Sequence, residues 1–530
     1  MRALKITIEE LETWLSIKIG GIERSYIFLV VLIIIYGIIF SNLTILRYYA
    51  FKTRAWDLGI FTQSLWTTLY ADRFFYHTCE IFVNPSGSFF GVHFSPILFL
   101  ILPFYRVYTA PETLLVLQSF VIALAALPIY KLAKDYNRSK LAGLTFAFAY
   151  LMYPAIQWVN WYDFHVQAFL PLFFTFAIYY ATKENWGKYF LFLIFSLMCE
   201  EHVAFITFFI GLYIAWKYRR NIILAVKKKK FSREIKVTLL TMVISVVWYW
   251  FTLWQRDTFF PINPIAASEF FGAANFTILG AGDPLEIPLM IILRPLNAIH
   301  ALIYNGHMKL LFIFLTFSPL SFYSFKRISA LIPTIPWFVF SLMSQTTVHY
   351  ILGNQYPAYI TAFIFIAAIF GLRSNFLNTE IKSIKKPLKK IIICSLIIFS
   401  ITSPLSPLIY KLFPETAIFI DERERLLNDI VSKLPQNASI LTQDNIFPHV
   451  SHRLNAYVIP NRFLGTSIRD FVIEFVNKTI DQVEYILLDS KTDPTATALV
   501  ISMLETKPDF TLVISEDDNT ILLYQRKNTH

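Results

Sequence analysis

The sequence predicts a mainly α-helical, polytopic membrane protein with about eleven transmembrane helices and a small C-terminal α/β domain outside the membrane. Two observations lead to this prediction. The 530 residues are 56% hydrophobic and only 16% charged, a balance that one soluble core of this length could not bury. Several windows of about 17–25 residues carry almost no charge, which is the length a helix needs to cross the hydrocarbon layer.

The positive charge belongs to the predicted membrane part. The chain carries +11 in total, but residues 411–530 hold 12 Lys and Arg against 17 Asp and Glu. Basic residues among membrane helices usually set orientation, because they remain on the cytoplasmic side during insertion. We therefore expect a lipid bilayer, and no nucleic acid, as the partner. The three cysteines have no metal-type spacing and indicate neither disulfides nor a zinc knuckle.

Five basic connections give the expected orientation in the cell membrane. They are 131–140, 183–188, 217–236, 326–327 and 373–390. With all five in the cytoplasm, the predicted helices are 26–46, 112–134, 141–156, 166–182, 188–199, 203–217, 237–254, 308–325, 328–344, 356–372 and 391–409. The N-terminus then lies inside. A transmembrane domain, 1–410, is followed by an extracytoplasmic domain, 411–530.

The first outer loop, 47–111, is long and aromatic. Its segment 95–108 is short and bounded by proline, so it predicts a helix in the outer interface and not a span. The apolar run 188–217 can make two crossings only if it turns near residues 200–202. Polar side chains at that turn would reach the outer surface or a water-filled cavity.

The pattern changes after Glu415. Residues 422–435 alternate apolar and charged side chains at helical spacing, and 438–451, 484–490 and 511–527 contain short β-rich runs. The last run predicts a closing hairpin with its turn at Asp517–Asn519. Three basic residues of this domain, His449, His452 and Arg453, could face the membrane site, but a surface role is the favoured interpretation.

Asp57 is the first candidate for chemistry. It stands in AWDLGIFTQSLW (55–66), where aromatic neighbours limit hydration and favour a carboxylate that can accept a proton. The structural alternative is an N-cap of an amphipathic helix over 58–69. Trp56, Phe61 and Trp66 also suit an interfacial helix that would hold the acid at the membrane surface.

Other ionisable and polar groups fall on the same predicted side. Asp163 and His165 in YDFH are spaced to share a ligand, although two residues are too few for a metal site. Glu200, Glu201 and His202 in CEEH are costly in an apolar run unless paired, for instance Glu201 with His165 or an arginine. The remaining candidates are His93, His349, Tyr350 and Gln355 for a hydroxylated ligand, and Arg294 for a lipid phosphate.

Each of these has a simpler interpretation as well. Lone histidines are more often structural. Arginines on the outer side, which include Arg54, Arg73, Arg256 and Arg294 together with Lys309, often anchor to lipid headgroups.

The order of these motifs resembles a known family. WDLGIFTQSLW, then HFSPILFLILPFYRVY, YDFH, CEEH and HYILGNQYPAYI look like a family of predicted archaeal and bacterial membrane proteins known as a domain of unknown function. The resemblance covers most of 45–500. That family in turn resembles the GT-C superfamily of membrane glycosyltransferases, which have many membrane helices, a long first outer loop and often an outer C-terminal domain.

The resemblance implies a polyprenyl-phosphate-linked sugar donor and a catalytic base in the first outer loop. Asp57 takes that position and would deprotonate an acceptor, which displaces the lipid phosphate with inversion. An arginine or a divalent metal ion would stabilise the leaving phosphate. The chain departs from better-known branches in lacking a clear second acidic motif in the first loop. It also carries Glu200–His202 where relatives often have a lysine or another polar residue.

Two other functions remain open at this point. A transporter or flippase would also use acids and histidines near the membrane, but we detect no inverted repeat, and the polar groups gather at the outer surface instead of the bilayer midplane. A non-catalytic scaffold that presents the outer domain would leave the acids of CEEH without a purpose.

Overall fold

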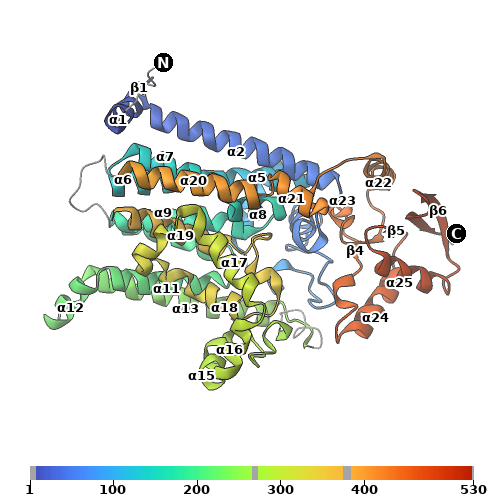
Figure 1. The fold of residues 1–530 in the computed structure, drawn as a ribbon. Helices are drawn as coiled ribbons and strands as arrows, with labels where there is room; N and C mark the ends of the chain where they lie inside the picture. Colours follow the sequence, from blue (N-terminus) through green and yellow to red (C-terminus); the bar gives the residue numbers. More distant parts are fainter. Residues whose placement is uncertain (1–6, 265–272, 374–383, 528–530) are drawn as a thin grey trace, which may run out of the picture.

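The computed structural model describes residues 7–264, 273–373 and 384–527 as a helical bundle with an α/β unit at one end (Figure 1). The predicted mainly helical class with several apolar helices is confirmed. The helices of the bundle are α1 (Ile8–Ser16), α2 (Arg24–Tyr49), α3 (Ile60–Tyr70), α4 (Ile97–Val107), α5 (Pro111–Leu124), α6 (Ala126–Asn137), α7 (Lys140–Leu151), α8 (Pro154–Tyr162), α9 (Leu170–Thr182), α10 (Trp186–Leu197), α11 (Val203–Lys217), α12 (Arg219–Lys227), α13 (Arg233–Phe259), α15 (Ile287–Leu293), α16 (Pro295–Ile303), α17 (Gly306–Phe317), α18 (Ile335–Met343), α19 (Ala358–Arg373), α20 (Lys385–Thr402) and α21 (Pro407–Leu412). Shorter elements are β1 (Lys18–Ile19), β2 (Ile22–Glu23), the π-helical turn η1 (Ala55–Gly59), and the 3₁₀ segments η3 (Val166–Phe169) and η7 (Tyr323–Thr334).

Helix lengths vary more than the sequence predicts. Among the described residues, four stretches are long and apolar enough to cross a membrane unaided, namely Arg24–Tyr49, Pro111–Asn137, Arg233–Phe259 and Lys385–Leu412. Two bent pairs, with bends of 117° and 114°, raise this to six if each pair is one span. Most of the other apolar helices have 10–17 residues, below the usual crossing length. About eleven spans therefore stays a prediction.

Two breaks in the helices have proline as their cause. The helix predicted over 141–156 ends at Leu151 and restarts at Pro154, because the residue before a proline is driven out of the helical region. Tyr153 accordingly has φ −75° and ψ 114°. Arg294, before Pro295, likewise separates α15 from α16, a pair that the sequence interpretation left without helices. The first break allows α8 to end beside residues 47–111, the predicted first outer loop, which keeps that name below.

The centre of the bundle is α19. Every residue from Ala358 to Leu372 is buried, as expected for a helix that is apolar on all sides. Gly371 lies against the backbone carbonyl of Tyr323 in η7, where a β-carbon would collide. A glycine therefore lets these two elements approach closely near the end of α19.

The basic connections gather at one end of the bundle. Lys183 pairs with the last turn of α6 at 2.7 Å, and Arg373 donates a hydrogen bond to the carbonyl of Tyr136 at 2.7 Å. Glu12 of α1 accepts hydrogen bonds from backbone N–H groups at the start of α7. The α/β unit lies at the opposite end (Figure 1). This grouping agrees with the sequence, whereas the orientation in the membrane stays a prediction; 374–383 lie outside the described residues.

Residues 422–527 form an α/β unit, called the C-terminal unit below. Its strands are β3 (Ile440–Thr442), β4 (Ala456–Val458), β5 (Tyr485–Asp489), β6 (Phe510–Glu516) and β7 (Ile521–Arg526), in the order β4-β3-β5-β7-β6. Its helices are α22 (Glu422–Lys433), α23 (Phe447–Val450), α24 (Arg469–Ile480) and α25 (Pro494–Leu504). Strand β3 is parallel to β4 and β5, while β7 is antiparallel to β5 and β6. The predicted β6–β7 hairpin is confirmed, with positive φ at Asp517–Asn519.

The C-terminal unit packs on the first outer loop. The hydroxyl oxygens of Thr62 and Ser451 lie 2.8 Å apart, and the Gln63 amide donates to the carbonyl of Arg453 at 2.9 Å. Gly59 faces the ring of Phe447 so closely that a β-carbon there would force the ring to move. These contacts fix the loop that carries Asp57 against the unit.

The surface role expected for three basic residues of this unit is wrong, because all three take part in this packing. The ring of His449 stacks on Tyr48 and Phe51, with centroids 4.1 and 3.9 Å apart. Nε2 of His452 lies 2.6 Å from the Tyr105 hydroxyl. The side chain of Arg453 is buried and donates to backbone carbonyls of its own unit.

Candidate functional site

Asp57 lies inside η1, a single π-helical turn of the kind that often marks functional sites. The residue is only 8% exposed, and its Oδ1 lies 2.9 Å from Nε2 of His165. It makes no capping hydrogen bond to η1 or to α3, so the N-cap interpretation is wrong. The carboxylate is instead held by a histidine from a distant part of the chain.

Asp57 also lines a cavity of about 590 Å³ between the first outer loop and the C-terminal unit. This volume falls in the range of small-molecule sites. The residues around the cavity are Arg54, Trp56, Asp57, Tyr162, Asp444, Asn461, Arg462, Leu464, Gly465, Asp493 and Thr495. His165 is not among them, so only Asp57 of this pair borders the cavity.

The contribution of the C-terminal unit follows from its sheet topology. Asp444 follows β3, Asn461 and Arg462 follow β4, and Asp493 follows β5. The carboxyl ends of parallel strands meet at one edge, and open α/β sheets bind ligands there, where the strand order reverses. Strand β3 lies between β4 and β5, which places that reversal at the cavity. The sequence interpretation found the β-rich runs but not these residues, although polar residues directly after successive runs were the available signal.

Two guanidinium groups stand on the cavity wall. Nη1 of Arg54 lies 2.8 Å from Oδ2 of Asp444, whose Oδ1 accepts the N–H of Ala55 at 2.8 Å. Burial raises the pKa of Asp444, although Arg54 opposes that shift. The guanidinium of Arg462 lies 4.8 Å from the centroid of the Trp56 ring. The cavity therefore carries both signs of charge near Asp57.

Asp163 and His165 are positioned by Gln118 of α5. The Gln118 amide donates to the carbonyl of Asp163 at 2.7 Å and accepts the N–H of His165 at 2.7 Å. Oδ2 of Asp163 accepts the N–H of Arg54 at 2.9 Å, and Oδ1 lies 3.7 Å from Nη2 of Arg47. Burial raises the pKa of Asp163, an effect that Arg47 opposes. The loop of Asp163 and His165 thus contacts both Asp57 and the backbone of Arg54, a pairing that the sequence interpretation did not name.

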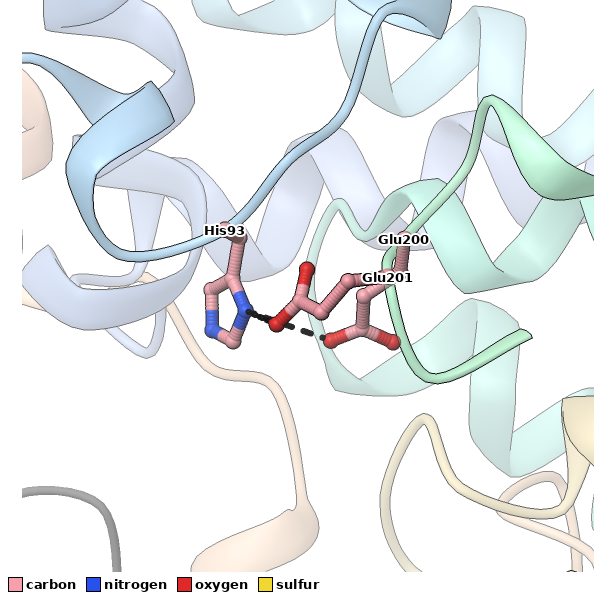
Figure 2. Close-up of side chains that lie close together, drawn as sticks. All are labelled: His93, Glu200 and Glu201. Atoms are coloured by element: carbon pink, nitrogen blue, oxygen red, sulfur yellow. Dashed lines mark hydrogen bonds and ion pairs between the residues drawn. The ribbon is translucent and has the colours of Figure 1, made fainter. Parts of the chain in front are cut away.

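A second polar centre lies apart from the cavity. Figure 2 shows His93 of the first outer loop facing Glu200 and Glu201 from the turn between α10 and α11. Nδ1 of His93 lies 3.0 Å from Oε1 of Glu201 and 3.4 Å from Oε1 of Glu200. Glu201 therefore pairs with His93, and not with His165 or an arginine as considered from the sequence. His202 is half exposed, with Nδ1 3.3 Å from the same oxygen of Glu201.

Aromatic rings separate the two centres. Phe61 lies 6.1 Å from the ring of His165 and 5.0 Å from Phe89, whose centroid is 6.0 Å from that of His93. None of His93, Glu200 and Glu201 lines the cavity. The ionisable groups that the sequence places on one side of the membrane therefore form two neighbouring centres in the structure.

The other predicted site residues do not line the cavity either. Nδ1 of His349 lies 2.7 Å from the Ser344 hydroxyl, and the Tyr350 hydroxyl donates to the carbonyl of Gln345 at 3.1 Å. Gln355 is half-buried, and its carbonyl accepts the N–H of Ala358. Arg294 is exposed at the bend between α15 and α16.

Lys309, which the sequence groups with cations suited to lipid headgroups, is buried and donates to the carbonyls of Ala301 and Leu342 at 2.6 and 2.7 Å. These two bonds satisfy carbonyl groups near the ends of α16 and α18. The residue therefore has a structural role.

Comparisons with known proteins give a family and similar solved structures. A family model described as "Predicted membrane protein (DUF2079)" matches residues 47–510, which include both polar centres. No curated protein matches the sequence. The crystal structure of ArnT from Cupriavidus metallidurans in the apo state is 12% identical, with a TM-score of 0.46; the alignment covers 92% of this chain and 97% of that chain.

Proposed function

The chain belongs to the DUF2079 family of predicted membrane proteins, and we propose that it is a membrane glycosyltransferase of the GT-C type. It transfers a sugar from a polyprenyl-phosphate donor to an acceptor hydroxyl or amide at the extracytoplasmic face, with Asp57 as base. One observation carries the proposal. The carboxylate of Asp57, held by His165, lines a cavity of about 590 Å³ that also contains Arg54 and Arg462.

In the proposed reaction, Asp57 takes the proton of the acceptor as the acceptor atom attacks the anomeric carbon. The bond between that carbon and the phosphate oxygen breaks, its electron pair leaves on the phosphate, and the configuration inverts. A base in hydrogen-bond reach of the acceptor contributes about 10²–10⁴-fold to such a step. His165 is a positioning residue, since it touches Asp57 at 2.9 Å but does not line the cavity.

The two guanidinium groups on the cavity wall suit the departure of the phosphate. Arginine binds phosphate oxygens through several N–H donors and keeps its charge, so Arg54 and Arg462 would stabilise the negative charge of the leaving phosphate. The polar edge of the C-terminal unit would face the acceptor or the sugar. A cavity of about 590 Å³ has room for a sugar phosphate but not for a polyprenyl chain, which would lie in the bilayer.

A transporter is the second candidate, because transporters use broken helices at their substrate sites. The bent pairs Pro284–Leu293 with Pro295–Ile303 and Gly306–Leu320 with Tyr323–Met343 are of this kind. Within the part of the chain that the structure describes, no residue of either pair lines the Asp57 cavity. Uptake of a labelled solute by vesicles containing the purified protein, unchanged in Asp57→Asn, would favour transport over transfer.

Asp57→Asn tests the proposed function, because the amide keeps the size of the side chain but cannot serve as a base. Polyprenyl-phosphate sugars are extracted from cells that express wild type or variant and are compared by mass spectrometry. A donor species consumed in the presence of wild type should accumulate with Asp57→Asn. Asp72→Asn is the matched control, since Asp72 is an exposed acid of the same loop. Equal consumption by wild type and Asp57→Asn would refute the role of Asp57 as base.

A further inference from the structure

The His93 cluster has the chemistry of a metal site. It combines one imidazole with two carboxylates, and the three ligand atoms lie within 4.8 Å of one another. We propose that His93, Glu200 and Glu201 bind a divalent transition-metal ion, most favourably Zn²⁺, and that this site is independent of the Asp57 cavity. Imidazole suits Zn²⁺, whereas Mg²⁺ and Ca²⁺ favour sites built from oxygen alone.

The distances within the cluster match those between ligands of one ion. Zn²⁺ binds imidazole nitrogen and carboxylate oxygen at about 2.0–2.2 Å in a tetrahedral arrangement, which separates neighbouring ligand atoms by roughly 3.3–3.5 Å. Nδ1 of His93 lies 3.4 Å from Oε1 of Glu200 and 3.0 Å from Oε1 of Glu201. A slight spreading of the second pair would bring both distances to His93 into that range.

Each carboxylate is already oriented by a second hydrogen bond. The hydroxyl of Tyr359 in α19 donates to Oε2 of Glu200, and the backbone N–H of Phe94 donates to Oε2 of Glu201 at 3.0 Å. In both residues the outer oxygen is therefore held and the Oε1 oxygen is turned toward His93, as Figure 2 shows for the side chains themselves. Such outer partners hold the ligands of metal sites in place.

The site also has a way in and a candidate for the fourth position. The His93 side chain is 39% exposed, so the cluster is not sealed from its surroundings. His202, half exposed and with Nδ1 3.3 Å from Oε1 of Glu201, can complete a tetrahedron by a small rotation, or water can take that place. The ion would join the first outer loop to the turn between α10 and α11.

Zinc retention by the purified full-length protein tests the proposal. The protein is stripped with a chelator in detergent, dialysed against Zn²⁺, and analysed by mass spectrometry for bound metal. Wild type should retain one equivalent, with a higher melting temperature than the stripped protein, because an ion that binds only the folded state stabilises it. Mg²⁺ should have no such effect. A wild type that retains no zinc and melts unchanged, or that responds to Mg²⁺ instead, overturns the proposal.

Variants separate a metal site from an ion pair. His93→Ala and Glu201→Gln should lose the bound zinc, whereas His307→Ala, at an exposed histidine outside the cluster, should retain it. Tyr359→Phe leaves all three ligands in place and should weaken zinc binding by about 10–100-fold, as loss of an outer partner does. His93→Lys keeps a positive charge for an ion pair and should still lose the zinc. Zinc binding of normal affinity in His93→Ala and His93→Lys would show that the cluster does not hold the metal.

Discussion

The two polar centres use the same kinds of residue and differ in what surrounds them. In each, a side chain of the first outer loop meets a partner from a later turn, as Asp57 does with His165 and His93 with Glu201. Asp57 opens on a cavity of about 590 Å³ walled by the C-terminal unit. His93 and its carboxylates close on one another, and both outer oxygens are occupied. A reaction at Asp57 needs room for a substrate beside the carboxylate. A bound ion needs ligand atoms that converge on one point, as those of the His93 cluster do.

This contrast implies that each centre can be damaged without the other. Asp57→Asn should lower turnover by about 10²–10⁴-fold, because it removes the proposed base, and should leave zinc retention unchanged. The measurement is turnover in the assay in which wild type acts, with bound metal determined on the same preparation. A parallel fall in zinc content would show that the two centres form one unit. Asp72→Asn provides the baseline for a charge lost from the same loop.

Loss of the Gln118 clamp, by which Gln118 holds the backbone of Asp163 and His165, should be the next largest effect. Gln118→Ala leaves the carbonyl of Asp163 and the N–H of His165 without their bonds. A buried polar group without its partner costs about 1–3 kcal/mol, so we expect a loss of about 3 kcal/mol in the free energy of unfolding. Thermal melting in detergent measures it. Gln482→Ala, at an exposed glutamine, should change nothing, and an equal loss there would refute the clamp.

The sequence predicts one centre better than the other, for physical reasons. Asp57, Asp163 and His165 could be identified because an acid or histidine among aromatic residues is costly unless it has a role. The partner of Glu201 could not be identified from the sequence, since His93 lies 108 positions away and no periodic pattern links the two segments. The turn at 200–202 could still be predicted from the sequence, because its polar residues interrupt a long apolar run.

The C-terminal unit shows a similar limit. Its hairpin was predicted because Asp517–Asn519 have turn chemistry between two β-rich runs. The cavity residues Asp444 and Arg462 follow strands of three residues, too short for an alternating pattern to fix where they end. Their convergence depends on the order β4-β3-β5, which no local pattern contains. The helix break at Pro154 was missed as well, because the apolar pattern of 141–156 continues through it, although the proline marks the break directly.

Glu80 lies under the electrostatic influence of both centres and offers a smaller test that depends on pH. Burial raises its pKa from 4.5 to about 7, although His93 and Arg462 oppose the shift. A folded state that holds the proton more tightly is favoured below about pH 4.5 and loses that contribution as pH rises through about 7. Burial lowers the pKa of the neighbouring His77 to about 3, so that histidine stays neutral throughout.

The glutamine side chain in Glu80→Gln is neutral at every pH. The variant should therefore not lose stability as pH rises through about 7, as wild type does. Its melting temperature should equal that of wild type near pH 4.5 and exceed it at pH 8. The difference at pH 8 should correspond to at most about 3 kcal/mol in the free energy of unfolding. Glu474→Gln, at an exposed acid of α24 paired with Lys478, is the control and should show no such divergence. Parallel pH profiles for wild type and Glu80→Gln would contradict a buried carboxyl with a raised pKa.

The smallest expected effect concerns a hydrogen bond between the first outer loop and the C-terminal unit. Thr62→Val removes the hydroxyl that faces Ser451, but Ser451 keeps its hydrogen bond to the carbonyl of Pro448, so only about 1 kcal/mol should be lost. Amide hydrogen exchange should then become about fivefold faster at residues 447–456 and stay unchanged around His93. Thr182→Val is the control, because it removes a threonine hydroxyl that bonds within its own helix at the far end of the bundle. It should leave exchange unchanged both at residues 447–456 and around His93. Equally faster amide exchange at residues 447–456 and around His93 would mean that the two centres unfold together. They would then differ in their chemical groups but not in their packing.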